Sequence, residues 1–246
     1  MNDSSSAPPE DFHSFLSWLK DKTESAWTKK SPPALEDFVR RGMGGSAWRK
    51  GTKWQSGFSD TELDQAHARW GVEFPEEYRT FLRVLGAPTP LMFRAMFQGS
   101  TLVATDGPSF YDWAHDDDYI ENACSWPLDG LLFDVESNDV WLPAWGERQE
   151  SKDERRIHLS RLVDAAPKLV PVSQHRYLAH APAAPKGYVV LSVWQTDIIT
   201  YGVDLRSFLL NELSGLIGKW IDWGQARTTT NNVIGSIAFW GDLVVG

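Results

Sequence analysis

One run of the sequence, residues 187–202, constrains the fold more than any other stretch. It is rich in β-branched and aromatic residues, and Asp197 is its only charged residue. Alternate positions define two apolar faces, with Tyr188, Val190 and Trp194 on one and Val189, Leu191 and Val193 on the other. A strand that is apolar on both faces has to be covered on both. We therefore expect this run to be the central strand of a mixed core of helices and sheet.

The polar residues Gln195-Thr196-Asp197 interrupt the run. They predict a kinked continuation of the strand, with either cross-strand hydrogen bonds at a bulge or a ligand site. An unpaired charge inside a buried strand is costly. We therefore expect Asp197 to be largely buried and paired with Arg176.

The length of 246 residues suits one large domain with appendages. The first ten residues are small, polar and acidic, and they predict a disordered leader over 1–10. We expect a helical extension packed on the core over 11–55, and a main domain with a C-terminal closing segment over 56–246. The short apolar run Leu131–Val135 predicts a strand. The expected fold class is α+β, with a twisted, largely antiparallel central sheet covered by helices.

Capping signals predict two short helices between residues 59 and 86. Ser59 and Glu62 have the spacing of a capping box, Gly71 suits the end of the first helix, and Pro75 suits the start of the second. The second helix carries an apolar stripe of Tyr78, Phe81 and Leu82. We expect these three side chains to pack on the sheet.

The charge of the chain is concentrated in one segment. The net charge is −9, but residues 112–154 alone carry 13 acids and 2 bases, so the rest of the chain sums to +2. This acidity argues against a nucleic-acid binder and is compatible with a basic partner. Asp116, Asp117, Asp118 and Glu121 are the candidate contact residues, with a merely solvated acidic loop as the alternative. The alternating acids of a calcium loop are absent, and we expect neither a metal nor another cofactor.

The expected location is cytoplasmic. The start of the chain lacks the basic and apolar regions of a signal peptide. No apolar run reaches the roughly 20 residues that span a bilayer, so no membrane partner is expected. The single cysteine, Cys124, excludes an internal disulfide framework.

A second group of polar residues could carry chemistry. It combines a polar cluster that precedes the central run with the polar residues in and after its interruption. The group comprises His175, Arg176, Tyr177, Gln195, Thr196, Asp197 and Tyr201. Imidazole, guanidinium and phenol groups could form a ligand pocket or an acid–base site. The alternative is a buried hydrogen-bonding role. The indoles of Trp113, Trp126, Trp141 and Trp145 could likewise be a stacking surface or ordinary core.

Five stretches, in order, resemble the SUKH superfamily and its Smi/Knr branch, named for fungal cell-wall-assembly regulators. They span roughly residues 10–246. They are Lys53–Ser59 with Gly71–Leu82, Leu132–Glu136 with Trp141 and Trp145-Gly146, Pro167–Val172 with His175-Arg176-Tyr177, Val193–Ile199 with Tyr201-Gly202, and Phe239–Leu243. The resemblance implies a SUKH-type α+β fold.

Many bacterial SUKH relatives are immunity proteins that neutralise polymorphic toxins by direct binding. The resemblance therefore implies a non-catalytic protein-binding module whose partner is a toxin domain with a basic surface. One alternative is a regulatory or scaffold protein that binds a cellular partner. Another is a small-ligand-binding protein or enzyme that uses the cluster of His175, Arg176, Tyr177 and Asp197.

Overall fold

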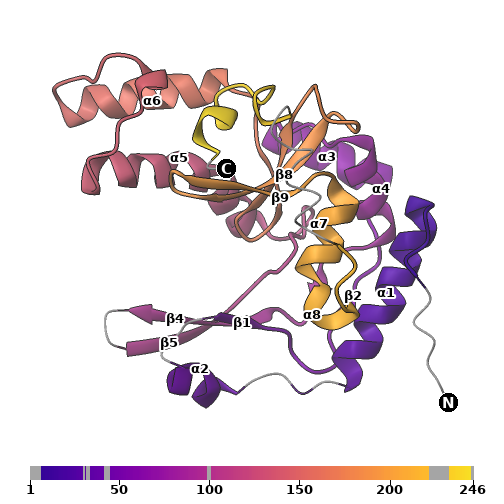
Figure 1. The fold of residues 1–246 in the computed structure, drawn as a ribbon. Helices are drawn as coiled ribbons and strands as arrows, with labels where there is room; N and C mark the ends of the chain where they lie inside the picture. Colours follow the sequence, from indigo (N-terminus) through magenta and orange to yellow (C-terminus); the bar gives the residue numbers. More distant parts are fainter. Residues whose placement is uncertain are drawn as a thin grey trace.

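The computed structural model describes residues 7–29, 31, 34–41, 45–98, 101–221 and 233–244. Most of the expected leader, residues 1–6, therefore lies outside the described residues. The centre of the fold is a four-stranded antiparallel sheet in the order β6-β7-β8-β9. Its strands are β6 (Val170–Ser173), β7 (Arg176–His180), β8 (Tyr188–Trp194) and β9 (Asp197–Gly202). The helices and antiparallel sheets confirm the expected α+β class (Figure 1).

The strand β8 is buried on both faces, as its sequence predicts. Tyr188 and Val190 belong to one apolar core, while Val189, Leu191 and Val193 belong to another. The first core is completed by α1 (Phe12–Lys29), α3 (Asp60–Trp70), α4 (Glu76–Val84) and α7 (Leu205–Glu212), followed by the short helix α8 (Ser214–Ile217). The second core is completed by α5 (Asp117–Ser137), α6 (Lys152–Ala165) and the 3-10 turns η1 (Pro143–Trp145) and η2 (Trp240–Leu243).

The expected kinked continuation of the central strand is wrong, because the chain reverses at residues 195–196. Trp194 pairs with Asp197 across a two-residue turn, and β9 runs back along β8. Gln195 has a φ of 58°, in the left-handed region that tight hairpin turns require. The polar interruption therefore marks the end of one strand and the start of the next.

The predicted pair of short helices is confirmed. The Ser59 and Glu62 side chains form the capping box of α3, and Gly71 ends that helix with a φ of 61°. The stripe of α4 is in the core, with Tyr78, Phe81 and Leu82 each at most 2% exposed. The N-terminal helix α1 shares this core through Phe15, Leu16, Leu19 and Trp27.

Two smaller sheets flank the core. The strands β1 (Gly45–Ala47), β4 (Met92–Gln98) and β5 (Thr101–Gly107) form a three-stranded sheet in the order β1-β4-β5. Figure 1 shows this sheet apart from the four-stranded one, with α2 (Leu35–Arg41) beside it. The strands β2 (Lys53–Trp54) and β3 (Pro88–Thr89) pair with each other.

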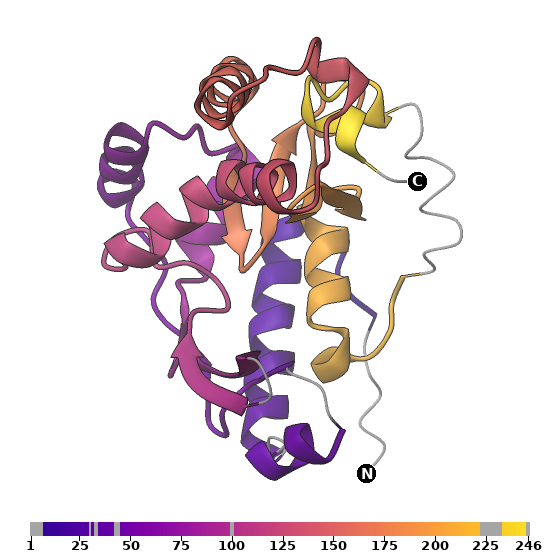
Figure 2. The same ribbon diagram turned by 90° about the vertical axis from the view of Figure 1, so that its left-hand side faces the viewer.

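The expected strand over Leu131–Val135 is wrong, because these residues lie in α5. Leu131, Leu132 and Val135 are buried and Phe133 is exposed, as one face of a helix requires. A short apolar run does not distinguish a strand from a buried helical segment. Figure 2 shows α5 in front of the four-stranded sheet.

A proline inside α5 explains the position of Tyr177. Pro127 has no N–H, so the Ala123 carbonyl four residues earlier lacks its usual intrahelical donor. The buried Tyr177 hydroxyl donates a hydrogen bond to this carbonyl at 2.9 Å. The strand β7 thus satisfies a backbone acceptor that the helix itself leaves open.

We expect Tyr177→Phe to lower the free energy of unfolding by about 1–3 kcal/mol, because it leaves the Ala123 carbonyl buried and unpaired. Urea denaturation measures the change. The control is the double variant Tyr177→Phe/Pro127→Ala, in which the new N–H at position 127 can donate to the same carbonyl. The loss of stability caused by Tyr177→Phe should therefore be smaller in the Pro127→Ala background than in the wild-type background. Equal losses in the two backgrounds would contradict this explanation.

Candidate functional site

The polar residues singled out in the sequence do not form one site. Neighbouring residues on a strand point to opposite faces of the sheet. His175 and Tyr177 therefore lie on one side of β7, where they line a cleft, and Arg176 lies on the other side. The structure separates the seven residues into three groups.

The first group surrounds Arg176. Its guanidinium donates a hydrogen bond to the Ser192 hydroxyl at 2.9 Å and lies 3.9 Å from the centre of the Tyr201 ring. Glu212 is the nearby acid: burial raises the pKa of its carboxyl, and the charge of Arg176 and a hydrogen bond with Tyr201 oppose that rise. Stacking on an aromatic ring and hydrogen bonding to strand neighbours indicate a structural role for Arg176.

The second group is the turn between β8 and β9. The Thr196 amide and hydroxyl both donate to the Asp134 carboxylate of α5, at 2.9 and 2.5 Å, and Asn138 donates to its other oxygen at 2.6 Å. Burial raises the pKa of Asp134, but these hydrogen bonds outweigh it, and the net pKa lies below the usual value. The helix also approaches the turn closely at Gly130, where a Cβ atom would be 3.0 Å from the Gln195 Cα.

The prediction for Asp197 is wrong: its side chain is exposed and Arg176 is not its partner. The residue is the first of β9, directly after the hairpin turn, and its side chain faces solvent there. The buried carboxylate that the turn needs is supplied instead by Asp134, 62 positions away in the sequence.

The third group, His175 and Tyr177, contributes to a cleft of about 590 Å³, which we call the aromatic cleft. It lies between the β1-β4-β5 sheet, the start of α5 and the ends of β7 and β8. Aromatic rings form a large part of its wall. Its lining includes Arg94, Tyr111, Tyr119, Asn122, Trp126, Gln174, His175, Tyr177 and Trp194.

The aromatic cleft has a positive electrostatic character. Burial, and then the charges of Arg176 and Arg94, lower the pKa of His175 to about 4, so this imidazole is neutral near pH 7. Arg94 donates to the Pro108 carbonyl, while its Nε is buried without a hydrogen-bond partner. The lining includes no Asp or Glu among the described residues.

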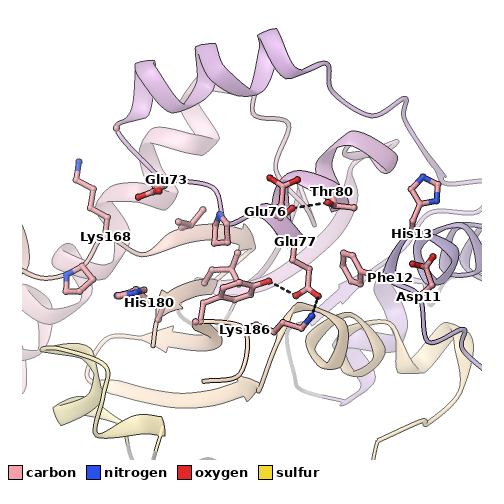
Figure 3. Close-up of a pocket in the computed structure, with 18 residues that line it drawn as sticks. Asp11, Phe12, His13, Glu73, Glu76, Glu77, Thr80, Lys168, His180 and Lys186 are labelled. Atoms are coloured by element: carbon pink, nitrogen blue, oxygen red, sulfur yellow. Dashed lines mark hydrogen bonds and ion pairs between the residues drawn. The ribbon is translucent and has the colours of Figure 1, made fainter. Parts of the chain in front are cut away.

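A larger cleft of about 1010 Å³ lies on the other side of the sheet, beside the start of α4 (Figure 3). At its centre the Glu77 carboxylate accepts a hydrogen bond from Tyr188 at 2.5 Å and lies 3.6 Å from the Lys186 amine. Burial, and then the Glu77 hydrogen bond, raise the pKa of Tyr188, so its phenol stays protonated. The rest of the lining mixes acids with Lys168 and histidines, so no single ligand charge is favoured.

The acidic segment has two kinds of carboxylate. Five of its 13 acids have partners within the protein: Asp112 accepts from the Ala114 and His115 amides, Asp117 pairs with Arg69, Asp134 holds the turn, Asp139 pairs with Arg148 and Glu154 caps α6. A sixth, Asp116, is half-buried just before α5 and makes no side-chain hydrogen bond to the start of that helix. Burial, and then Asp112, raise the pKa of Asp116. The other seven are exposed and have no ion-pair partner among the described residues: Asp118, Glu121, Asp129, Glu136, Glu147, Glu150 and Asp153.

Four of these seven carboxylates lie along one side of α5. With about 100° of rotation per residue, Asp118, Asp129 and Glu136 fall within about 20° of one another, and Glu121 lies about 60° to one side. They extend over about 27 Å of helix at about 1.5 Å per residue. Phe133, 51% exposed, lies about 60° to the other side. We call Asp118, Glu121, Asp129 and Glu136 the acidic α5 face.

Of the four candidate contact residues, Asp118 and Glu121 belong to this face. Asp116 and Asp117 do not, because Asp116 is half-buried before the helix begins and Asp117 pairs with Arg69. Of the four indoles, Trp113 and Trp145 are core residues and Trp141 packs half-buried against Trp145. Trp126, 36% exposed, lines the aromatic cleft.

Sequence reasoning missed Arg94, Trp194 as a cleft residue, and Asp134. Arg94 stands in a strand that pairs in another sheet, and no local pattern connects it with His175. The only sequence signal for Trp194 was its position directly before the polar interruption. A large apolar residue at the end of a strand has fewer neighbouring residues to bury it, so it can remain exposed.

The described residues contain neither a candidate metal site nor a candidate membrane span. No group of three or more His, Cys, Asp or Glu side chains there is arranged to hold a metal ion. Within the same residues, no helix combines the length and the apolar character needed to cross a bilayer.

Comparison of the chain with protein-family models, curated proteins and solved structures finds no match. Its function has to be argued from the arrangement of its own side chains.

Proposed function

We propose that this chain is a non-catalytic protein-binding module that binds a basic protein partner through the acidic α5 face. The observation that carries the proposal is the set of exposed carboxylates without ion pairs, four of which line one side of α5. Self-repulsion among like charges opposes compact folding, and a basic partner would relieve it.

The composition of this surface supports a protein partner over a free cation. The four carboxylates extend over about 27 Å, which is the scale of a protein interface and exceeds that of an ion site. Phe133, 51% exposed, flanks them and offers an apolar contact of the kind that anchors interfaces. Charge complementarity over such an area raises the association rate by electrostatic steering.

The resemblance to SUKH immunity proteins supports a toxin domain as the partner, and the proposal includes the expected cytoplasmic location. An acidic immunity surface can mimic the phosphate charge that a basic nuclease toxin recognises. A regulatory or scaffold protein would use the same surface on a different partner. The partner's own activity separates these two versions of the proposal.

The test begins with affinity purification from the source cells, using the full chain as bait, and with expression of the captured partner. We expect the triple variant Asp118→Lys/Glu121→Lys/Asp129→Lys to associate with that partner at least tenfold more slowly than wild type at low salt. The difference should shrink at high salt, because salt screens exposed charges. Stopped-flow or biosensor kinetics across ionic strength measure both effects.

The matched control is Glu10→Lys/Asp21→Lys/Glu36→Lys. It makes the same change in net charge, from −9 to −3, at exposed acids outside α5. This control should keep most of the wild-type association rate. If both triple variants slow association equally, only net charge matters and the acidic α5 face is not the binding surface. If the α5 variant binds at the wild-type rate, the proposal is wrong.

A growth assay then distinguishes the two kinds of partner. A toxin expressed alone should arrest growth, and co-expression of the wild-type chain should restore it. Co-expression of the α5 triple variant should restore growth less well. A captured partner that binds through α5 but leaves growth unaffected would support the regulatory or scaffold version.

A further inference from the structure

The aromatic cleft has the size and walls of a small-molecule site. Its volume of about 590 Å³ falls within the range of about 300–1,000 Å³ typical of ligand pockets. Its polar wall groups are largely tied to the backbone: the hydroxyl of Tyr111 donates to the Gln174 carbonyl at 2.6 Å, and the indole of Trp126 donates to the Val193 carbonyl at 3.3 Å. Rings held in this way present flat faces in fixed positions.

Trp194 is the side chain that the fold leaves uncovered. The other residues of β8 are buried, but Trp194 is 48% exposed. Its ring lies 5.3 Å from that of Trp126 and 5.5 Å from that of His175, measured between centroids. An aromatic ligand in the cleft would cover this indole and add stacking contacts to it.

Arg94 favours a negatively charged ligand in the aromatic cleft. Its guanidinium has one hydrogen bond, to the Pro108 carbonyl, and no carboxylate partner among the described residues. Arg94 is half-buried, and a charge withdrawn from water is normally paired with an opposite charge. Burial is the main reason why the pKa of His175 is lowered, and the positive charges of Arg176 and Arg94 lower it further. The same charges favour an anion in the cleft.

We propose that the aromatic cleft binds a planar aromatic carboxylate, with the ring against Trp194 and Trp126 and the carboxylate directed toward Arg94. The planar guanidinium fork can bind a carboxylate through two parallel hydrogen bonds. The side-chain amides of Asn122 and Gln174 also line the cleft and offer further hydrogen bonds. This site is independent of the protein partner proposed for the acidic α5 face.

The test compares three probes that share an indole ring and differ in charge: indole-3-acetate, indole-3-acetamide and tryptamine. Calorimetry and ligand-observed NMR on the full chain measure binding. We expect indole-3-acetate to bind at least tenfold more tightly than the amide, and tryptamine to bind more weakly still. Tryptamine binding as tight as indole-3-acetate would overturn the proposal.

Two variants locate the probe. Arg94→Met should weaken indole-3-acetate at least tenfold and abolish the preference over the amide. Trp194→Ala, at a half-exposed position, should weaken both probes. Arg161→Met, a matched change at an exposed arginine of α6, should leave binding unchanged.

The wild-type probe series decides the question even if Arg94→Met fails to fold. Unchanged binding of indole-3-acetate to Trp194→Ala would place the ligand elsewhere and overturn the assignment. Equal binding of the acetate and the neutral amide would also overturn it, and would indicate that the cleft receives an uncharged aromatic group, such as a side chain of a partner protein.

Discussion

Replacing Phe81 by alanine should lower the free energy of unfolding by about 3–5 kcal/mol. Phe81 is 1% exposed in the middle of α4, so the substitution leaves a cavity that the surroundings fill only in part. Its ring lies 5.7 to 6.1 Å, between centroids, from three others: Tyr78, Trp54 and Phe110. Each of these aromatic pairs adds to the loss from apolar burial alone.

Urea or thermal denaturation measures this effect, and Thr80→Ala is the neighbouring control. The Thr80 hydroxyl donates only to the Glu76 carbonyl of its own helix. Its removal should change the stability by no more than about 0.5 kcal/mol. A loss below about 1 kcal/mol for Phe81→Ala would mean that α4 does not pack on the core through this face.

Replacing Asp134 by alanine should lower the free energy of unfolding by about 2–4 kcal/mol, because hydrogen bonds to a charged acceptor contribute about 1.5–3 kcal/mol each and are not fully additive. The change removes the acceptor of both Thr196 hydrogen bonds and of the Asn138 hydrogen bond. Asp197→Ala is the matched control in the same hairpin. Since Asp197 is exposed, its loss should stay within about 0.5 kcal/mol.

The effect of Asp134→Ala should depend on pH. The pKa of Asp134 is lower in the folded protein than its ordinary value, so its carboxylate stabilises the fold above the unfolded-state pKa of about 4. This contribution is lost as the pH falls through the folded-state pKa. The difference in stability between wild type and Asp134→Ala should therefore be largest near neutral pH and shrink below about pH 4. A difference that is constant from pH 7 to pH 3 would contradict the role of the charged carboxylate.

The candidate site was only partly predictable. The acidic segment was visible in the sequence, but its seven exposed, unpaired carboxylates could not be separated from the other six. That separation depends on partners such as Arg69 and on burial, which the local sequence does not encode. Likewise, His175, Arg176 and Tyr177 are consecutive, but strand geometry sends His175 and Tyr177 to one face and Arg176 to the other.

The sequence by itself determined the local features of this protein. The capping box at Ser59 and the left-handed Gly71 are set by interactions within a few residues, and the two apolar faces of β8 follow from alternation along one strand. Only the tertiary structure decided how distant residues meet: Asp134 with Thr196, Tyr177 with the Ala123 carbonyl, and Arg94 with His175 in one cleft. The physical reason is that local patterns record which side of an element is apolar, while the partner of a polar group depends on which elements the chain's topology brings together.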